Sequence, residues 1–474
     1  MKSSAIFLFC MSVAVACVAQ KPDIPKAHWA LVAQYLESQE NLSGVVMLAQ
    51  GGKVKFSQGY GFADRKAQTP YSEKTLATIG SITKPFTATA ILLLLEQGKL
   101  RVEDPLSQYF PNLPADKKAI TLHHLLTHSS GLPDAIGDDY ETISKEDFLK
   151  RAFAKPLTFA PGEGYAYSNV GYSILGMLVE QISGVNYDAF LQKNIFAPAG
   201  METAGYSNPA ANERLLAHGY LQDGTDWGTS KSKNWNGKEP YWHLKANGGL
   251  LMSAKDMMQW YLALRDHKVL KPATLKLQTT PYVSEGGGSY YGYGYAIFGG
   301  GQSVEHNGGN GIFRADFRWF PELDLCLFSA SNDAAVRLFR LGDEIMDILL
   351  SGELPNRANW QTIPINQAPA NAQQQTAQAL AALLADFSEA KASAFIESHC
   401  SAGIIERNGR ERLVGLFQML SKDSNGAPLE AMLESEGKLQ LVLSAGEEAS
   451  AKLKITLGFL GDQLDKLQAE MENN

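Results

Sequence analysis

The chain has 474 residues, enough for one core of about 300 residues and a second, smaller domain. Its 42 Lys and Arg against 50 Asp and Glu give a net charge of -8, and it carries no basic run that could follow a phosphate backbone. We therefore expect no nucleic-acid partner. A hydrophobic content of 45% with 10% aromatic residues argues against a largely disordered chain.

Residues 1–19 have the order of a secretory signal peptide: Lys2, an apolar stretch over 5–18, and small residues at its end. A membrane-spanning helix needs about 20 apolar residues, and this stretch is shorter. We therefore expect export to the periplasm or the medium after removal of the signal. Residues 14–17 also loosely resemble a lipoprotein box, so a lipid anchor on Cys17 stays open as the one expected contact with a membrane.

The first part of the chain predicts a helix, a hairpin and then a long helical stretch. Residues 22–40 are typical of a helix, and residues 43–57 are typical of a β-hairpin turning at Gly51 and Gly52. Apolar residues are nearly continuous over 82–97, a length that indicates a helix buried in the core. A mainly helical stretch follows.

Strand patterns return later, at residues 291–298, 303–307, 313–320 and 323–329, before an amphipathic helix at 334–350. Strands at both ends with helices between them predict one antiparallel sheet interrupted by a helical insertion. We therefore expect an α+β fold for the main domain, residues 27–352.

A domain boundary is expected after the main domain. Residues 353–378 are rich in Pro, Asn, Gln and Ala, which is a linker composition. Beyond them, 379–398 predicts a helix, and strand patterns follow as far as residue 460. The sequence thus predicts a small C-terminal α+β domain at 379–474, without convincing catalytic residues.

The first chemical motif is Ser81-Ile-Thr-Lys84, at the start of the apolar helix. Residues three apart share a helix face, so Lys84 can approach the Ser81 hydroxyl. Serine is a weak nucleophile without a neighbouring base, and a desolvated lysine can be that base. The positive end of the helix dipole would favour an oxyanion. By itself, the motif fits a serine helix cap beside a solvated lysine better than a catalytic pair.

Two further motifs follow along the chain. Tyr167-Ser-Asn169 offers a phenol that a nearby cation makes easier to deprotonate, and an amide that can hold a carbonyl or the lysine. His306-Asn-Gly308, followed by Gly309, ends a predicted strand, where glycines let a substrate lie against the strand edge. By itself, Tyr167-Ser-Asn169 also fits a loop tyrosine before an asparagine helix cap. His306-Asn-Gly308 by itself also fits a glycine-rich turn after a strand.

Taken together and in this order, Ser-x-x-Lys, Tyr-Ser-Asn and His-x-Gly resemble the superfamily of class C β-lactamases, D-Ala-D-Ala carboxypeptidases and family VIII esterases. Residues 125–133, 161–165, 248–254 and 306–309 are similar to that group as well. The resemblance covers about residues 27–352. It implies the β-lactamase/transpeptidase-like fold, an antiparallel sheet flanked by helices with a helical subdomain.

The resemblance also implies an acyl-enzyme mechanism without a metal or organic cofactor. Ser81 would attack a carbonyl, and Lys84 and the Tyr167 phenolate would accept its proton. The amides of Ser81 and Gly309 would hold the oxyanion, and Asn169 would orient the substrate and Lys84. Water would then hydrolyse the ester formed on Ser81.

The third motif departs from the β-lactamases of this group, which carry Lys-Thr-Gly there. His306 and Asn307 replace the two residues that favour the antibiotic's carboxylate, and Gly309 lacks the hydroxyl found in similar carboxypeptidases. We therefore expect hydrolysis of an ester, amide or D-peptide bond in a small molecule or peptide. A β-lactamase, a D-Ala-D-Ala carboxypeptidase and a penicillin-binding sensor that does not turn over stay open.

His124 and His128 have a spacing found in zinc sites, but no glutamate or third ligand accompanies them, so we expect no metal site. The resemblance makes His128 a structural residue.

The C-terminal hundred residues loosely resemble the NTF2-like or lipocalin-like extensions behind such hydrolases. The sequence predicts no particular oligomeric state.

Overall fold

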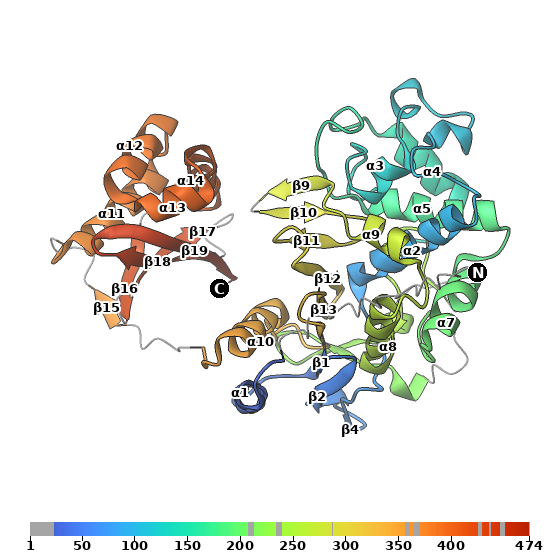
Figure 1. The fold of residues 1–474 in the computed structure, drawn as a ribbon, viewed down its shortest axis with the longest axis horizontal. Helices are drawn as coiled ribbons and strands as arrows, with labels where there is room; N and C mark the ends of the chain where they lie inside the picture. Colours follow the sequence, from blue (N-terminus) through green and yellow to red (C-terminus); the bar gives the residue numbers. More distant parts are fainter. Residues whose placement is uncertain are drawn as a thin grey trace, which may run out of the picture. The chain divides into compact units, whose positions relative to one another are not determined.

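The computed structural model describes residues 23–206, 213–233, 239–286, 288–355, 361–363, 369–424, 429–435, 438–445 and 451–473. The predicted signal peptide, residues 1–19, and Cys17 lie outside these ranges. The chain divides into two compact units, Met1–Pro355 and Asn356–Asn474 (Figure 1). This division falls within the segment whose composition marks a domain boundary.

An eight-stranded antiparallel sheet forms the centre of the first unit. Its strands are β1 (Gly44–Gln50), β2 (Lys53–Tyr60), β9 (Val283–Gly286), β10 (Ser289–Tyr291), β11 (Ala296–Phe298), β12 (Ser303–Asn310), β13 (Phe313–Phe320) and β14 (Leu325–Ser331). They follow the order β2-β1-β14-β13-β12-β11-β10-β9, so β1 lies beside β14, the last strand of this sheet along the chain. The segment between β2 and β9 is the predicted helical insertion.

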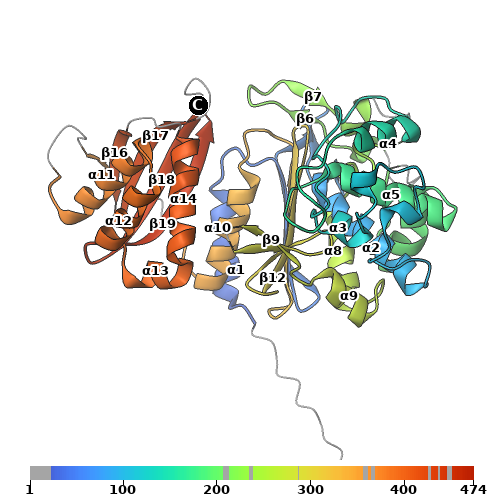
Figure 2. The same cartoon turned by 90° about the horizontal axis from the view of Figure 1, so that it is seen from above.

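The central strands are buried on both faces. In β1, Val45 and Met47 face the core under the helical insertion, whereas Val46 and Leu48 face α1 (Lys26–Glu37) and α10 (Leu338–Ser351). Successive side chains of a strand point to opposite faces, so a strand covered on both sides has a continuous apolar sequence. Figure 2 shows the sheet between α1 and α10 on one side and the insertion on the other.

The helical layer is built around α2 (Thr83–Glu96), which is apolar on most of its circumference and buried accordingly. It packs closely against α5 (Asn169–Ser183). The other helices of the layer are α3 (Leu122–Leu126), α4 (Lys145–Ala154), α6 (Tyr187–Leu191), α7 (Ala197–Ala199), α8 (Ala254–Arg265) and α9 (Pro272–Gln278). Short strand pairs join them: β3 (Phe62–Asp64) with β4 (Thr69–Pro70), β5 (Ala77–Thr78) with β8 (Leu251–Met252), and β6 (Gly219–Tyr220) with β7 (Asp226–Gly228).

Two predicted strand boundaries are wrong, both at glycines. The strand predicted at 291–298 is divided into β10 and β11, because Gly294 has a φ of +82° and lies against the backbone of Lys84 and Pro85. The strand predicted to end at 307 continues to Asn310 as β12. Its glycines are strand residues against which another segment packs closely, as described below.

The second unit is an α+β domain with a five-stranded antiparallel sheet, ordered β15-β16-β17-β18-β19. Its core joins helix residues such as Leu380 and Phe417 to sheet residues such as Leu441 and Ile455. The strands are β15 (Gln361–Ile363), β16 (Leu429–Ser435), β17 (Lys438–Ala445), β18 (Ala451–Leu460) and β19 (Gln463–Asn473), and the helices are α11 (Ala372–Ala385), α12 (Glu389–His399), α13 (Ala402–Asn408) and α14 (Arg410–Asp423).

The predicted linker at 353–378 is too long. It contains β15 and the first turns of α11, because the Ala and Gln taken for linker composition are strong helix formers. The single helix predicted at 379–398 is divided between α11 and α12, where Ser388 caps the second helix. The described sheet is open and joined to helices, unlike a lipocalin barrel. The NTF2-like resemblance stays a prediction.

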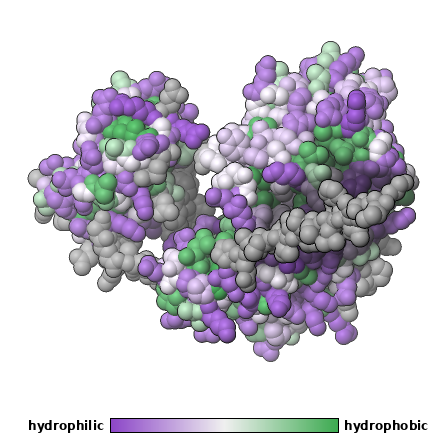
Figure 3. All heavy atoms as spheres, in the orientation of Figure 1, coloured by the Kyte–Doolittle hydropathy of each residue, from purple (hydrophilic) through white to green (hydrophobic). Residues whose placement is uncertain are grey.

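Among the described residues, no helix combines the length and the apolar composition needed to cross a lipid bilayer. On the face drawn in Figure 3, hydrophilic side chains are more widespread than apolar ones, which form smaller patches.

Candidate active site

Ser81 lies in the one-turn helix η1 (Gly80–Ile82), directly before α2. Gly80 turns the chain into this position with a φ of +54°, a conformation that favours glycine. Ser81 is partly buried and makes no capping hydrogen bond to the helix, while Lys84 is fully buried. The alternative of a serine cap beside a solvated lysine is therefore wrong.

The Lys84 amine lies among three acceptors. Its Nζ is 3.1 Å from Ser81 Oγ, 2.6 Å from Asn169 Oδ1 and 2.9 Å from the backbone oxygen of Asn247. An uncharged amine has two N–H groups and one lone pair. The two carbonyl oxygens only accept, so they take both N–H groups and leave the lone pair to the Ser81 hydroxyl. This arrangement suits a general base.

The charge state of Lys84 fits that role. Burial lowers the pKa of Lys84 from 10.5 to about 7, and the nearby carboxylates of Asp134 and Asp139 raise the pKa and limit the shift. A large fraction of the molecules therefore has an uncharged amine at neutral pH. An exposed lysine would be almost fully charged at the same pH.

Tyr167 lies beside the same two residues. The Lys84 Nζ is 4.7 Å from the centre of the Tyr167 ring, and the phenol is hydrogen-bonded to Ser81. Burial raises the pKa of Tyr167 above its usual value, and the charges of Asp134 and Glu285 raise it further. The direction of this shift favours the neutral phenol over the expected phenolate. Tyr167 is a neutral hydroxyl at neutral pH.

His128 fixes the segment that carries Tyr167. Its Nδ1 accepts a hydrogen bond from the Ser168 N–H at 3.0 Å, and its carbonyl accepts one from the Ala166 N–H at 2.9 Å. The His128 ring lies 4.2 Å from the Tyr167 ring. These contacts give His128 a structural role, and His124 Nδ1 accepts a backbone N–H at the start of α3. In the described ranges, no group of three or more His, Cys, Asp or Glu is arranged to hold a metal ion.

Two glycines let β12 pack directly against η1. A Cβ at Gly308 would lie 1.9 Å from the Ile79 oxygen and 2.9 Å from the Ser81 nitrogen, and a Cβ at Gly80 would lie 2.3 Å from the Gly309 nitrogen. Side-chain carbons do not approach other atoms this closely, so both positions require glycine. The contact brings together the backbone amides of Ser81 and Gly309, the two donors that an oxyanion needs.

We expect Gly308→Ala to lower kcat for p-nitrophenyl acetate by about 100-fold or more. The added methyl group must push β12 away from η1, and loss of one oxyanion donor costs about 10² to 10³ in kcat. Gly415→Ala is the control, because its Cβ would meet no atom within 4 Å. An unchanged kcat in folded Gly308→Ala would show that this contact does not form the oxyanion site.

His306 lies on β12, close enough to Lys84 to feel its charge, and is only 7% exposed. Its Nε2 is 3.0 Å from the Tyr291 hydroxyl, and its Nδ1 is 2.5 Å from the Asn307 carbonyl oxygen. The carbonyl only accepts, so Nδ1 carries the proton and Nε2 accepts from Tyr291. Burial and the charge of Lys84 lower the pKa of His306 to about 3. The imidazole is therefore neutral at physiological pH.

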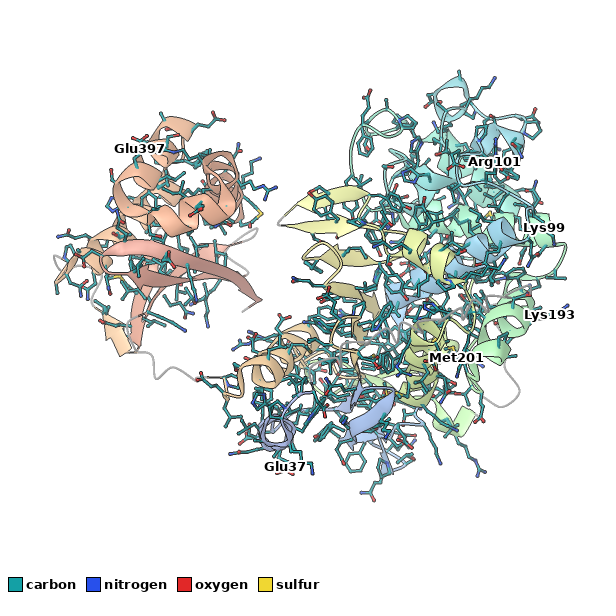
Figure 4. All side chains as sticks on the ribbon, viewed as in Figure 1. Glu37, Lys99, Arg101, Lys193, Met201 and Glu397 are labelled. Atoms are coloured by element: carbon teal, nitrogen blue, oxygen red, sulfur yellow. The ribbon has the colours of Figure 1, made fainter. Side chains whose placement is uncertain are left out.

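Charged side chains of both signs surround the site. Asp134, Asp139 and Glu285 are close enough to shift the pKa values of Lys84 or Tyr167. Basic side chains labelled in Figure 4 instead lie at the outer surface of the helical layer, namely Lys99, Arg101 and Lys193. Closer to the site, Arg314 pairs with Gly309 in the sheet, and its Nη1 lies 3.3 Å from the position that a Cβ at Gly309 would occupy. A substrate carboxylate would therefore meet charges of both signs.

The structure brings together all the predicted site residues: Ser81, Lys84, Tyr167, Asn169, His306, Gly308 and Gly309. Asn247 and Asp134 were not predicted from the sequence. Asn247 directly precedes the motif at 248–254 but contributes a backbone oxygen, which no residue type reveals. Asp134 directly follows the motif at 125–133, and its contacts depend on a segment 35 residues further along.

Comparisons with known proteins were made for the whole chain, and the family match lies within the first unit. The family model Beta-lactamase matches residues 30–348. Penicillin-binding protein 4* of Bacillus subtilis (strain 168) is 34% identical over 209 residues, which are 42% of this chain and 46% of that protein. Esterase EstB of Burkholderia gladioli is 32% identical over 197 residues, which are 37% of this chain and 50% of that protein. The chain thus spans about half the length of these relatives.

A solved structure extends the likeness in fold. The octameric penicillin-binding protein homologue from Pyrococcus abyssi matches 94% of this chain and 98% of its own, with a TM-score of 0.62 and 20% identity. The family model covers well over half of the chain and includes η1, α2, α5 and β12. The resemblance inferred from the three motifs and the expected fold are therefore confirmed, and the chain belongs to the Beta-lactamase family.

Proposed function

We propose that this protein is a serine hydrolase that forms an acyl-enzyme on Ser81 and cleaves an ester, amide or D-peptide bond. The main support is the 3.1 Å contact between Ser81 Oγ and the buried amine of Lys84. The two carbonyl partners of that amine take its N–H groups, so its lone pair is left to the serine when the amine is uncharged. The name of the relative EstB, an esterase, supports ester cleavage in particular.

The proposed reaction uses only side chains and amides of the site. Ser81 Oγ attacks the substrate carbonyl carbon while its proton passes to Lys84 Nζ. The carbonyl oxygen becomes an oxyanion, stabilised by the amides of Ser81 and Gly309. The Tyr167 hydroxyl gives its proton to the leaving oxygen or nitrogen and receives the proton held by Lys84. Water then attacks the acyl carbon, Lys84 takes the water proton, and Ser81 leaves with that proton.

The preferred substrate is proposed to be neutral near the scissile bond. The neutral imidazole of His306 offers no cation for a carboxylate. Penicillins and peptides ending in a free D-alanine carry such a carboxylate, so this observation disfavours a β-lactamase or a D-Ala-D-Ala carboxypeptidase. Steady-state turnover of a simple ester separates the hydrolase from a sensor that is acylated once.

We expect His306→Lys to raise the acylation rate by a cephalosporin, relative to that by p-nitrophenyl acetate, by about tenfold. One added cation near the substrate carboxylate is worth on the order of 1.4 kcal/mol, which corresponds to this factor. Gln302→Lys is the matched control, because it adds the same cation at an exposed position before the first residue of β12. No relative gain in His306→Lys, or a wild type faster on cephalosporins than on esters, would contradict the assignment of a neutral substrate.

We further propose that the protein acts outside the cytoplasm on a small-molecule or peptide substrate. The support is the signal-peptide pattern of residues 1–19. Sequencing the N-terminus of protein from the periplasm or medium tests this proposal, and an N-terminus at a lipidated Cys17 would indicate the membrane-anchored form.

A further inference from the structure

Asp134 lies between α3 and α4 and contacts the first residues of α5. Its Oδ1 accepts hydrogen bonds from Asn169 Nδ2 at 2.9 Å and from the Asn169 backbone N–H at 3.3 Å. Its carbonyl oxygen accepts from the Val170 N–H at 3.2 Å. The first amides of a helix have no partner within the helix, and negative charge is favourable there. Asp134 is therefore anchored at the start of α5.

These hydrogen bonds determine which end of the Asn169 side-chain amide faces Lys84. Rotation of the amide by 180° would exchange its oxygen and its nitrogen. A carboxylate only accepts, so Asp134 binds the nitrogen. The amide oxygen, Oδ1, is then left 2.6 Å from Lys84 Nζ.

The orientation of this amide controls the lone pair of Lys84. With the oxygen toward Lys84, the amine donates to Asn169 and Asn247, and its lone pair faces the Ser81 hydroxyl. With the nitrogen toward Lys84, the lone pair would accept a hydrogen bond from Asn169 and would be withdrawn from Ser81.

We infer that Asp134 is a positioning residue: it holds the Asn169 amide in the one orientation in which the uncharged Lys84 can deprotonate Ser81. This inference rests on the proposed function, since it assigns Asp134 a role in the same proton transfer. Asp134 acts through Asn169 and touches no reacting atom in this role.

A double-mutant cycle tests the inference with kcat/KM for p-nitrophenyl acetate. We expect Asp134→Ala to lower kcat/KM by about tenfold, because a hydrogen bond to a charged group is lost. Asn169→Ala should cost at least as much. The double variant should be no slower than Asn169→Ala, because Asp134 has no amide left to orient. The inference would be overturned if the kcat/KM losses of the two single variants multiplied in the double variant. It would also be overturned if Asp134→Ala had the kcat/KM of the wild type.

The pH profile gives a second measurement that does not depend on the alanine variant folding. Asp134→Asn keeps an oxygen acceptor, so most of kcat/KM should remain. The negative charge that raises the pKa of Lys84 is lost, so the acid limb of kcat/KM should move to lower pH. Asp138→Asn is the control from the same loop and should leave the limb in place. If the acid limb of the kcat/KM profile stays in place in Asp134→Asn, the role of Asp134 at Lys84 is contradicted. If the wild type shows no turnover that depends on Ser81, the proposed function itself is refuted.

Discussion

Ser81→Ala is expected to abolish ester turnover while the fold is kept. Removal of the nucleophile from a coupled catalytic unit typically costs about 10⁴-fold or more in kcat, because the remaining groups cannot act without it. The fold should tolerate the change, since the side chain is partly exposed and loses only its hydrogen bonds to Lys84 and Tyr167, each worth about 1 kcal/mol. Steady-state hydrolysis of p-nitrophenyl acetate and thermal unfolding measure the two effects.

The control for this variant is Ser57→Ala, an equivalent change at a serine of β2. It should hydrolyse the ester at the wild-type rate. If folded Ser81→Ala keeps turnover within about tenfold of wild type, another residue is the nucleophile.

Lys84→Met is expected to lower kcat by a similar factor, because the methionine has about the same length but no lone pair on nitrogen. In the wild type, kcat/KM should rise with pH through an apparent pKa near 7, since the uncharged amine is the active form. Rates measured from acidic to alkaline pH test this profile. A wild-type profile that is flat across neutral pH would argue against Lys84 as the base.

The same substitution should change how stability depends on pH. The pKa of Lys84 is about 7 in the folded protein and about 10.5 when unfolded, so the unfolded chain binds one more proton between these values. The free energy of unfolding of wild type should therefore rise with pH, relative to Lys84→Met, by up to about 1.4 kcal/mol per pH unit in this interval. Urea unfolding of both proteins at several pH values measures the difference. Parallel curves would show that Lys84 is not buried as described.

The sequence was sufficient for the elements and residues that depend on local pattern. The continuous apolar runs of β1 and α2 predicted buried elements, and the spacing of Ser81 and Lys84 predicted their contact. Patterns failed where a distant segment decides the conformation. Gly308 lies in a glycine-rich segment that is typical of a turn, yet it is a residue of strand β12. The reason for a glycine there is that η1, more than 200 residues earlier in the chain, packs directly against it.

Protonation states were the least predictable part of the site. Tyr167 and Lys84 belong to two motifs of the same expected site, so the sequence predicted a Tyr167 phenolate beside the Lys84 cation. Only the burial of both groups decides otherwise, because desolvation disfavours each charge: it raises the pKa of Tyr167 and lowers that of Lys84. Asp134 was missed for a related reason, since its importance depends on the hydrogen-bonding direction of the Asn169 amide.

Location of the acyl group tests the central proposal most directly. Wild-type protein is mixed with p-nitrophenyl acetate, quenched with acid before turnover is complete, digested and analysed by mass spectrometry. We predict an acetyl group on Ser81 that disappears with the kinetics of turnover. Turnover without an acylated Ser81, or an acetyl group that reacts onward from a different residue, would contradict the proposal.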